Sequence, residues 1–138
     1  YSRYKEIIMV SDPIGDFINR LKNAGAINAT EVELPYSILK HAVADALVQN
    51  GFLKSAKMTG KKVRKYLVVE LAYEHGRSKI RDVKRVSKPG RRLYASVHEI
   101  TPVKFGKGKL VLSTPKGILT GEQAKEQNVG GEKLFQIW

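Results

Sequence analysis

The sequence predicts an α+β fold with two small α/β domains. The N-terminal domain should run α-β-α-β-β, and the C-terminal domain should be mostly antiparallel β with one short helix. Two early segments carry apolar residues at helical spacing, and several short segments alternate polar and apolar residues. Gly and Pro break the second half into short stretches. A chain of 138 residues can bury the core of one domain or of two small ones.

Two helices are expected in the first half, each with its own start and stop signals. Asp12-Pro13 begins the first, because Asp caps free amides and Pro suits the first helical position, and Asn23 and Gly25 would end it. Ser37 caps the second, and Asn50-Gly51 would end it, since Gly tolerates the left-handed backbone common at helix ends.

Three strands complete the first half. Residues 30–34 alternate polar and apolar side chains, and residues 52–56 and 63–71 are predicted to pair around a turn at Thr59-Gly60. The polar segment 74–79 contains a glycine and is the candidate linker to the second half.

The second half is predicted to contain four short strands and one helix. The helix lies between Thr120 and Asn128, where Thr120 and Gln123 form a capping box, and Gly130-Gly131 follows as a stop. The strands are expected over residues 80–86, 91–97, 109–113 and 133–138.

Composition limits the classes of function. The net charge of +12 favours a polyanionic partner, nucleic acid before an anionic membrane, and residues 81–138 carry +7 of it. The absence of cysteine excludes disulfides, thiolate metal sites and a cysteine nucleophile. No apolar run approaches the roughly 20 residues that span a bilayer, and both early helices carry mixed charges, so we expect no membrane partner.

The densest basic cluster spans residues 77–92, which contain eight Lys or Arg residues and one acidic residue, Asp82. Its centre, Ser87 to Arg92, contains Pro-Gly and is predicted to be a rigid turn that presents Lys and Arg to phosphates. Tyr94 follows at once, and an aromatic ring beside arginines can stack on an unpaired base. A solvated strand face is the alternative, and we favour nucleic acid. The cluster consists of Arg77, Lys79, Arg81, Lys84, Arg85, Lys88, Arg91 and Arg92.

Two further features allow more than one interpretation. A second basic cluster surrounds the predicted hairpin turn, where phosphate contact and protection of a sheet edge are equally plausible. The loop 113–117 places two hydroxyls before Pro and Gly and could approach a base or ribose, although its composition alone favours an ordinary turn. The second cluster consists of Lys54, Lys57, Lys61, Lys62, Arg64 and Lys65.

No catalytic, cofactor or metal site is predicted. His41, His75 and His98 stand far apart with no carboxylate at ligand spacing, and Gly106-Lys107-Gly108 lacks the sequence of a dinucleotide or phosphate loop. Catalytic groups can still come from distant parts of a chain. A nucleic-acid-modifying enzyme and an RNA-binding regulator therefore stay as alternatives to a non-catalytic, structural RNA-binding protein.

Several motifs in order resemble the bacterial small-subunit ribosomal protein S-eight family, from about Met9 to the last residue. Residues 1–8 would then be an N-terminal extension, followed by domains at 9–76 and 77–138. The matching stretches are Asp12–Asp16, Arg20–Ala24, Leu34–Lys40, Arg85–Tyr94, Ser113–Thr120, Val129–Glu132 and Trp138.

The resemblance implies a structural constituent of the small ribosomal subunit in the cytoplasm. Such a protein binds the central domain of small-subunit ribosomal RNA early in assembly and helps to build the platform. Its partners would be that RNA and neighbouring small-subunit proteins, and some bacterial members also bind the messenger of their own operon.

The resemblance also implies which residues contact the RNA. Pro115 departs from the family, in which many members have serine, and the segment 105–109 replaces a more apolar pattern. The contacts mapped here are Ser113, Thr114, Pro115, Lys116, Gly117, Tyr94, Gly130, Gly131 and Glu132, together with Lys88, Arg91 and Arg92 of the basic turn. Secondary phosphate contacts are expected at Lys61, Lys62, Arg64, Lys84 and Arg85.

Overall fold

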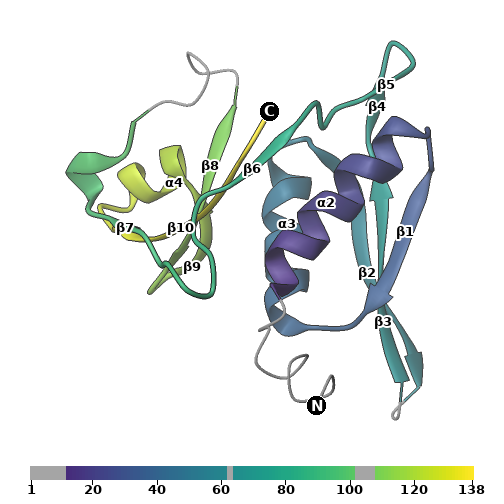
Figure 1. Ribbon diagram of the computed structural model, residues 1–138, viewed down its shortest axis with the longest axis horizontal. Coiled ribbons are helices and arrows are strands. Elements are labelled where there is room, and N and C mark those ends of the chain that lie inside the picture. Colours follow the sequence, from purple (N-terminus) through teal and green to yellow (C-terminus); the bar gives the residue numbers. More distant parts are fainter. Residues whose placement is uncertain (1–11, 62–63, 102–107) are drawn as a thin grey trace.

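The computed structural model describes residues 12–61, 64–101 and 108–138 and has an α+β fold, as predicted (Figure 1). The predicted extension at 1–8, Lys62 and most of the 105–109 segment lie outside the described residues. The first part comprises α2 (Pro13–Ala26), β1 (Glu31–Pro35), α3 (Ile38–Gln49), β2 (Leu53–Lys61) and β3 (Arg64–Leu71). The second comprises β6 (Val83–Arg85), β7 (Tyr94–Ala95), the 3-10 turn η1 (Val97–Glu99), β8 (Lys109–Thr114), β9 (Gly117–Thr120), α4 (Gly121–Glu126) and β10 (Gly131–Ile137).

Both early helices begin at the predicted caps. The Asp12 carboxylate accepts a hydrogen bond from the Gly15 amide at 3.1 Å, and the Ser37 hydroxyl accepts one from the Lys40 amide at 3.4 Å. Each bond satisfies an amide that has no partner within the helix. α3 ends at the predicted stop, where Gly51 has a φ of 84°.

The predicted stop of α2 is displaced by a few residues. Gly25 is not a terminator but lies buried in the last turn, and the left-handed residue after the helix is Asn28. A Cβ on Gly25 would lie 2.6 Å from the Ser78 hydroxyl oxygen. Gly25 therefore permits the close approach of a neighbouring strand.

The first sheet is antiparallel, with strand order β1-β3-β2, and Figure 1 shows α2 and α3 on one face of it. The predicted turn at Thr59-Gly60 is wrong, because these residues still belong to β2 and pair with Tyr66 and Lys65, just before the last pair of the β2–β3 ladder. A glycine in a strand can mark close backbone approach as well as a turn. A Cβ on Gly60 would overlap the carbonyl of Arg64.

The predicted linker contains a two-stranded hairpin, β4 (Tyr73–Glu74) and β5 (Arg77–Ser78). His75 and Gly76 form its turn with φ values of 54° and 76°, the left-handed backbone that two-residue hairpins require. The Tyr73 hydroxyl donates a hydrogen bond to the Ala29 carbonyl. The connection between the two parts therefore contains a hydrogen-bonded hairpin that is tied to the first part.

The second sheet has the order β6-β10-β8-β9, with β7 also paired to β10. The predicted strands at 80–86 and 91–97 shorten to three and two residues. β9 is a strand that the sequence did not predict; it pairs with β8 and closes a hairpin at Thr114 and Gly117. The capping box of α4 is confirmed, with the Thr120 amide 3.0 Å from the Gln123 side-chain oxygen.

The largest buried core runs through both parts of the molecule. It joins Ile14 and Phe17 of α2 to Phe135 and Ile137 of β10, all of them less than 5% exposed. A smaller cluster under α4 includes Leu112. Because the side chains of this shared core are close-packed, α2 and the second sheet are fixed relative to each other.

Candidate nucleic-acid interface

The Pro-Gly segment forms a tight turn whose backbone is bonded to itself. The amides and carbonyls of Lys88 and Arg91 exchange two hydrogen bonds of 2.9 Å. Ser87, which is 1% exposed, uses its hydroxyl to accept from the Leu93 amide at 2.9 Å and to donate to the Leu93 carbonyl at 3.2 Å. These bonds fix the base of the turn and leave the side chains of Lys88, Arg91 and Arg92 exposed.

Three of the predicted site residues form one row across three strands. Ser113 of β8 pairs with Glu132 of β10, and Glu132 pairs on its other side with Tyr94 of β7. Tyr94 is 62% exposed, so its ring is available to a partner. Arg92 lies beside the row, with its Nε 3.7 Å from a carboxylate oxygen of Glu132. We call Ser113, Glu132 and Tyr94 the strand row.

The loop 113–117 is the tip of the β8–β9 hairpin, next to the strand row. The Thr114 hydroxyl donates to the Gly117 carbonyl at 2.8 Å and accepts from the Lys116 amide at 3.1 Å. Pro115 and Lys116 are exposed at the tip. The hydroxyl therefore shapes the loop and has little hydrogen-bonding capacity left for a ligand.

The two adjacent glycines allow neighbouring strands to meet. A Cβ on Gly130 would overlap the Ala95 carbonyl, and one on Gly131 would overlap the Ser113 carbonyl. The two glycines thus have a structural role, because the strand row forms only where a side chain is absent. The predicted contact of Gly130, Gly131 and Glu132 with RNA stays a prediction.

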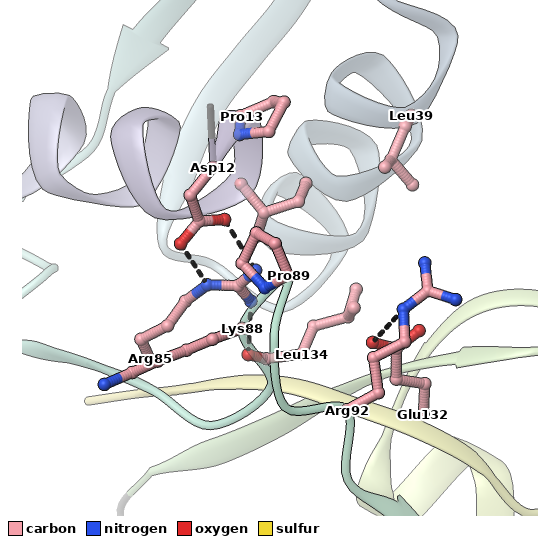
Figure 2. Close-up of a pocket in the computed structure, with 10 residues that line it drawn as sticks. Asp12, Pro13, Leu39, Arg85, Lys88, Pro89, Arg92, Glu132 and Leu134 are labelled. Carbon is pink, nitrogen blue, oxygen red and sulfur yellow. Dashed lines mark hydrogen bonds and ion pairs between the residues drawn. The ribbon is translucent and has the colours of Figure 1, made fainter. Parts of the chain in front are cut away.

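Arg85 is turned into the molecule. Its Nε and Nη2 donate to the two carboxylate oxygens of Asp12 at 2.9 and 2.6 Å, and its Nη1 donates to the Leu134 carbonyl at 2.8 Å (Figure 2). The hydrogen bond from Arg85 is the main reason that the pKa of Asp12 is lowered; burial opposes this shift, and the Gly15 amide adds to it. These three bonds hold the Arg85 guanidinium on Asp12 and Leu134 and away from the phosphate contacts of the neighbouring cations.

The remaining predicted cations lie apart from the strand row. Arg64 is exposed at the start of β3 in the first sheet, and Lys61 ends β2. Lys84 is exposed on β6, an edge strand of the second sheet. The structure thus brings together the residues of the turn, the strand row and the hairpin tip.

A cleft between the two parts was missed by the sequence analysis. It has a volume of about 380 Å³ and borders the Pro-Gly turn (Figure 2). Its walls come from four separate segments of the chain, so no local pattern could identify it. The lining residues are Asp12, Pro13, Ile14, Leu39, Arg85, Lys88, Pro89, Arg92, Glu132 and Leu134.

These features define a small, two-part α+β protein with exposed cations and an exposed aromatic ring around one end of a sheet, a surface typical of proteins that bind polyanions. Among the described residues, no helix is both long and apolar enough to cross a membrane.

The family model described as Ribosomal protein S8 matches residues 12–138. Small ribosomal subunit protein uS8 of Ruthia magnifica is 40% identical over 94% of this chain and 98% of its own length. The uS8 proteins of Agrobacterium fabrum and Mycoplasmopsis agalactiae are 42% and 40% identical, over 94% and 95% of this chain and 98% and 100% of their own lengths. The chain belongs to the ribosomal protein S8 family, structural components of the small ribosomal subunit, which confirms the resemblance.

Proposed function

We propose that this protein is a non-catalytic, cytoplasmic constituent of the small subunit that binds the central domain of small-subunit ribosomal RNA and helps to assemble the platform. The strand row carries this proposal, because it joins residues from three distant segments beside a cationic turn. Neighbouring small-subunit proteins are its further partners. Binding to the messenger of its own operon stays a prediction.

The cationic turn supplies the affinity. Lys88, Arg91 and Arg92 are exposed on a turn whose backbone is already fixed, so little entropy is lost when they contact phosphates. Each phosphate contact releases counterions, and binding therefore weakens steeply as salt rises. Lys84 adds a phosphate contact from the sheet edge, and Lys61 and Arg64 do so from the first sheet. A further phosphate contact at Lys62, which lies outside the described residues, stays a prediction.

The strand row and the hairpin tip supply the discrimination. Side chains cannot enter the deep groove of a regular RNA helix, so a protein selects distorted helices through unpaired bases and ribose hydroxyls. The exposed Tyr94 ring offers a stacking surface, and the hairpin tip offers the backbone of Pro115, Lys116 and Gly117 at close range. Thr114 acts by holding that tip in shape.

Filter binding with two RNAs tests the proposal: a transcript of the central domain and a regular duplex of equal length. Arg91→Ala should weaken binding to both and flatten the slope of log K against log salt by about 1. Thr114→Ala should instead reduce the preference for the transcript. Lys57→Ala removes an exposed cation from the first sheet and is the matched control, with a smaller expected effect.

Two results would contradict the proposal. One is wild-type protein that binds both RNAs equally at near-physiological salt. The other is Thr114→Ala protein that loses affinity for both RNAs to the same extent, since the hairpin tip would then have no selective role.

A further inference from the structure

The cleft between the two parts has an apolar floor and wall. Ile14 and Leu134 line it and are 4% and 5% exposed, whereas Leu39 at its opening is 43% exposed. Figure 2 shows Leu39 on the α3 side of the opening, with Pro89 of the Pro-Gly turn and Arg92 on the side of the second part. An apolar slot of this kind suits the face of a planar ring.

The polar groups deep in the cleft are already paired. Asp12 accepts from Arg85 and from the Gly15 amide, and the Leu134 carbonyl accepts from Arg85 and from the Val86 amide. These groups would gain little from a polar ligand, because their hydrogen-bonding capacity is largely used. The floor therefore favours an apolar or aromatic occupant.

Cations stand at the rim of the same cleft. Within the described residues, the Lys88 ammonium makes no side-chain hydrogen bond or ion pair, and Arg92 uses only Nε toward Glu132. A ligand seated on the apolar floor would meet the free donors of both residues at the opening, which suits an anion attached to a ring.

We propose that this cleft binds one unpaired nucleotide of an RNA, with its base between Leu39 and Pro89 and its phosphate on Lys88 and Arg92. The inference rests on the function proposed above and adds a specific nucleotide site to it. The volume of about 380 Å³ lies within the range of small-ligand sites. Lys88 and Arg92 also belong to the cationic turn, so an RNA bound there passes the opening.

The charge at the opening favours a nucleotide over the side chain of a partner protein. An apolar side chain inserted into the cleft would bring the Lys88 ammonium close to apolar surface without giving it a partner, which costs free energy, and would leave the remaining donors of Arg92 unused. A nucleotide carries its own anion and pairs with both. Insertion of an unpaired base also fits the way in which proteins recognise folded RNA.

Leu39→Trp tests the site by filling it, and Ile38→Trp is the matched control. Ile38 is the neighbouring residue, is 80% exposed and does not line the cleft. Loss of one bound base should weaken binding of the central-domain transcript by about tenfold for Leu39→Trp. Ile38→Trp should bind like the wild type.

Chemical probing of the transcript identifies the nucleotide. We expect one unpaired base to be protected from dimethyl sulfate or 2′-hydroxyl acylation by the wild type and by Ile38→Trp, and to become reactive with Leu39→Trp. If Leu39→Trp does not fold, as judged by circular dichroism, Leu39→Ala replaces it, because a half-exposed leucine tolerates truncation. Leu39→Ala should show the same loss of protection at that base.

The outcomes separate this site from the proposed function. If Leu39→Trp binds and protects the transcript like the wild type while Arg91→Ala loses affinity, the nucleotide site is wrong and the RNA-binding function stands. If Leu39→Trp binds RNA normally but fails to enter reconstituted subunits, the cleft contacts a protein and the inference is also wrong. If wild-type protein shows no preference for the transcript, the proposed function itself fails.

Discussion

Asp12 and Arg85, 73 residues apart in the sequence, form a two-pronged ion pair with N–O distances of 2.6 and 2.9 Å. The same carboxylate caps α2 through the Gly15 amide, and the same guanidinium binds the carbonyl of Leu134 in β10. One pair of side chains therefore ties the first helix of the first part to two strands of the second.

Replacing Asp12 by Ala should destabilise the whole molecule. The change removes the helix cap and leaves the guanidinium of Arg85, only 18% exposed, without its carboxylate. We expect the free energy of unfolding to fall by about 3 kcal/mol in urea titrations. The control is Asp16→Ala, which removes an exposed acidic group from the same first turn and should cost about 0.5 kcal/mol. Equal effects of the two substitutions would show that the ion pair contributes nothing.

The Asp12–Arg85 pair should also make stability depend on acid. The pKa of Asp12 in the folded protein lies below its ordinary value of 3.8, chiefly because Arg85 donates to the carboxylate. As the pH falls, the unfolded chain therefore binds a proton at Asp12 before the folded protein does. The stabilisation that the pair gives to the folded protein is complete above about pH 4 to 5 and is lost as the pH falls through the folded pKa. Urea titrations between pH 2 and 6 should show a steeper acid loss for the wild type than for Asp12→Asn. A constant difference between the two proteins at every pH would contradict this origin of the stability.

Gly131→Ala should disrupt the strand row. The new methyl group would overlap the backbone carbonyl of Ser113, and a backbone group cannot rotate away as a side chain can. We expect a loss of about 2 kcal/mol of unfolding free energy together with weaker binding to the central-domain transcript. The control is Gly90→Ala, because Gly90 has open space around its Cβ position and should tolerate alanine within about 0.5 kcal/mol. A stable Gly131→Ala protein would mean that β8 and β10 can separate there without cost.

Gly25→Ala should be rescued in part by a second substitution. The added Cβ would lie 2.6 Å from the Oγ and 2.7 Å from the Cβ of Ser78, and we expect it to cost about 1–3 kcal/mol. Ser78→Gly removes both of those atoms but also removes the hydroxyl that accepts from the Ile80 amide. A double-mutant cycle should therefore show a favourable coupling between the two changes. Additive costs would show that the two positions do not touch.

The helix starts were predictable because their signals are local. Asp12-Pro13 and Ser37 each act on amides within three residues, so the sequence alone contains both partners. Glycine was less informative. Gly25 and Gly60 fit stop and turn signals, yet each permits a close contact instead: Gly25 with Ser78, 53 residues away, and Gly60 with the Arg64 carbonyl across the β2–β3 ladder.

The site was predictable only in its parts. The charge and the Pro-Gly turn could be read directly, but the strand row needs the register of β7, β8 and β10, which local sequence does not contain. The resemblance to a family supplied those residues. Nothing local distinguishes Arg85 from a surface cation, because its partner Asp12 is 73 residues away, and the nucleotide cleft depends on the same long-range packing.

The position of β10 in its sheet has a consequence for the order of events during translation. The first part is built from the contiguous residues 13–71, so its strands can pair as soon as they have been synthesised. β10 is made after all the other strands of its sheet, yet it lies between β6 and β8 and also pairs with β7. The basic turn is therefore synthesised before the strand row beside it can form. That row is complete only when residues 131–137 have been made and have paired with β7 and β8.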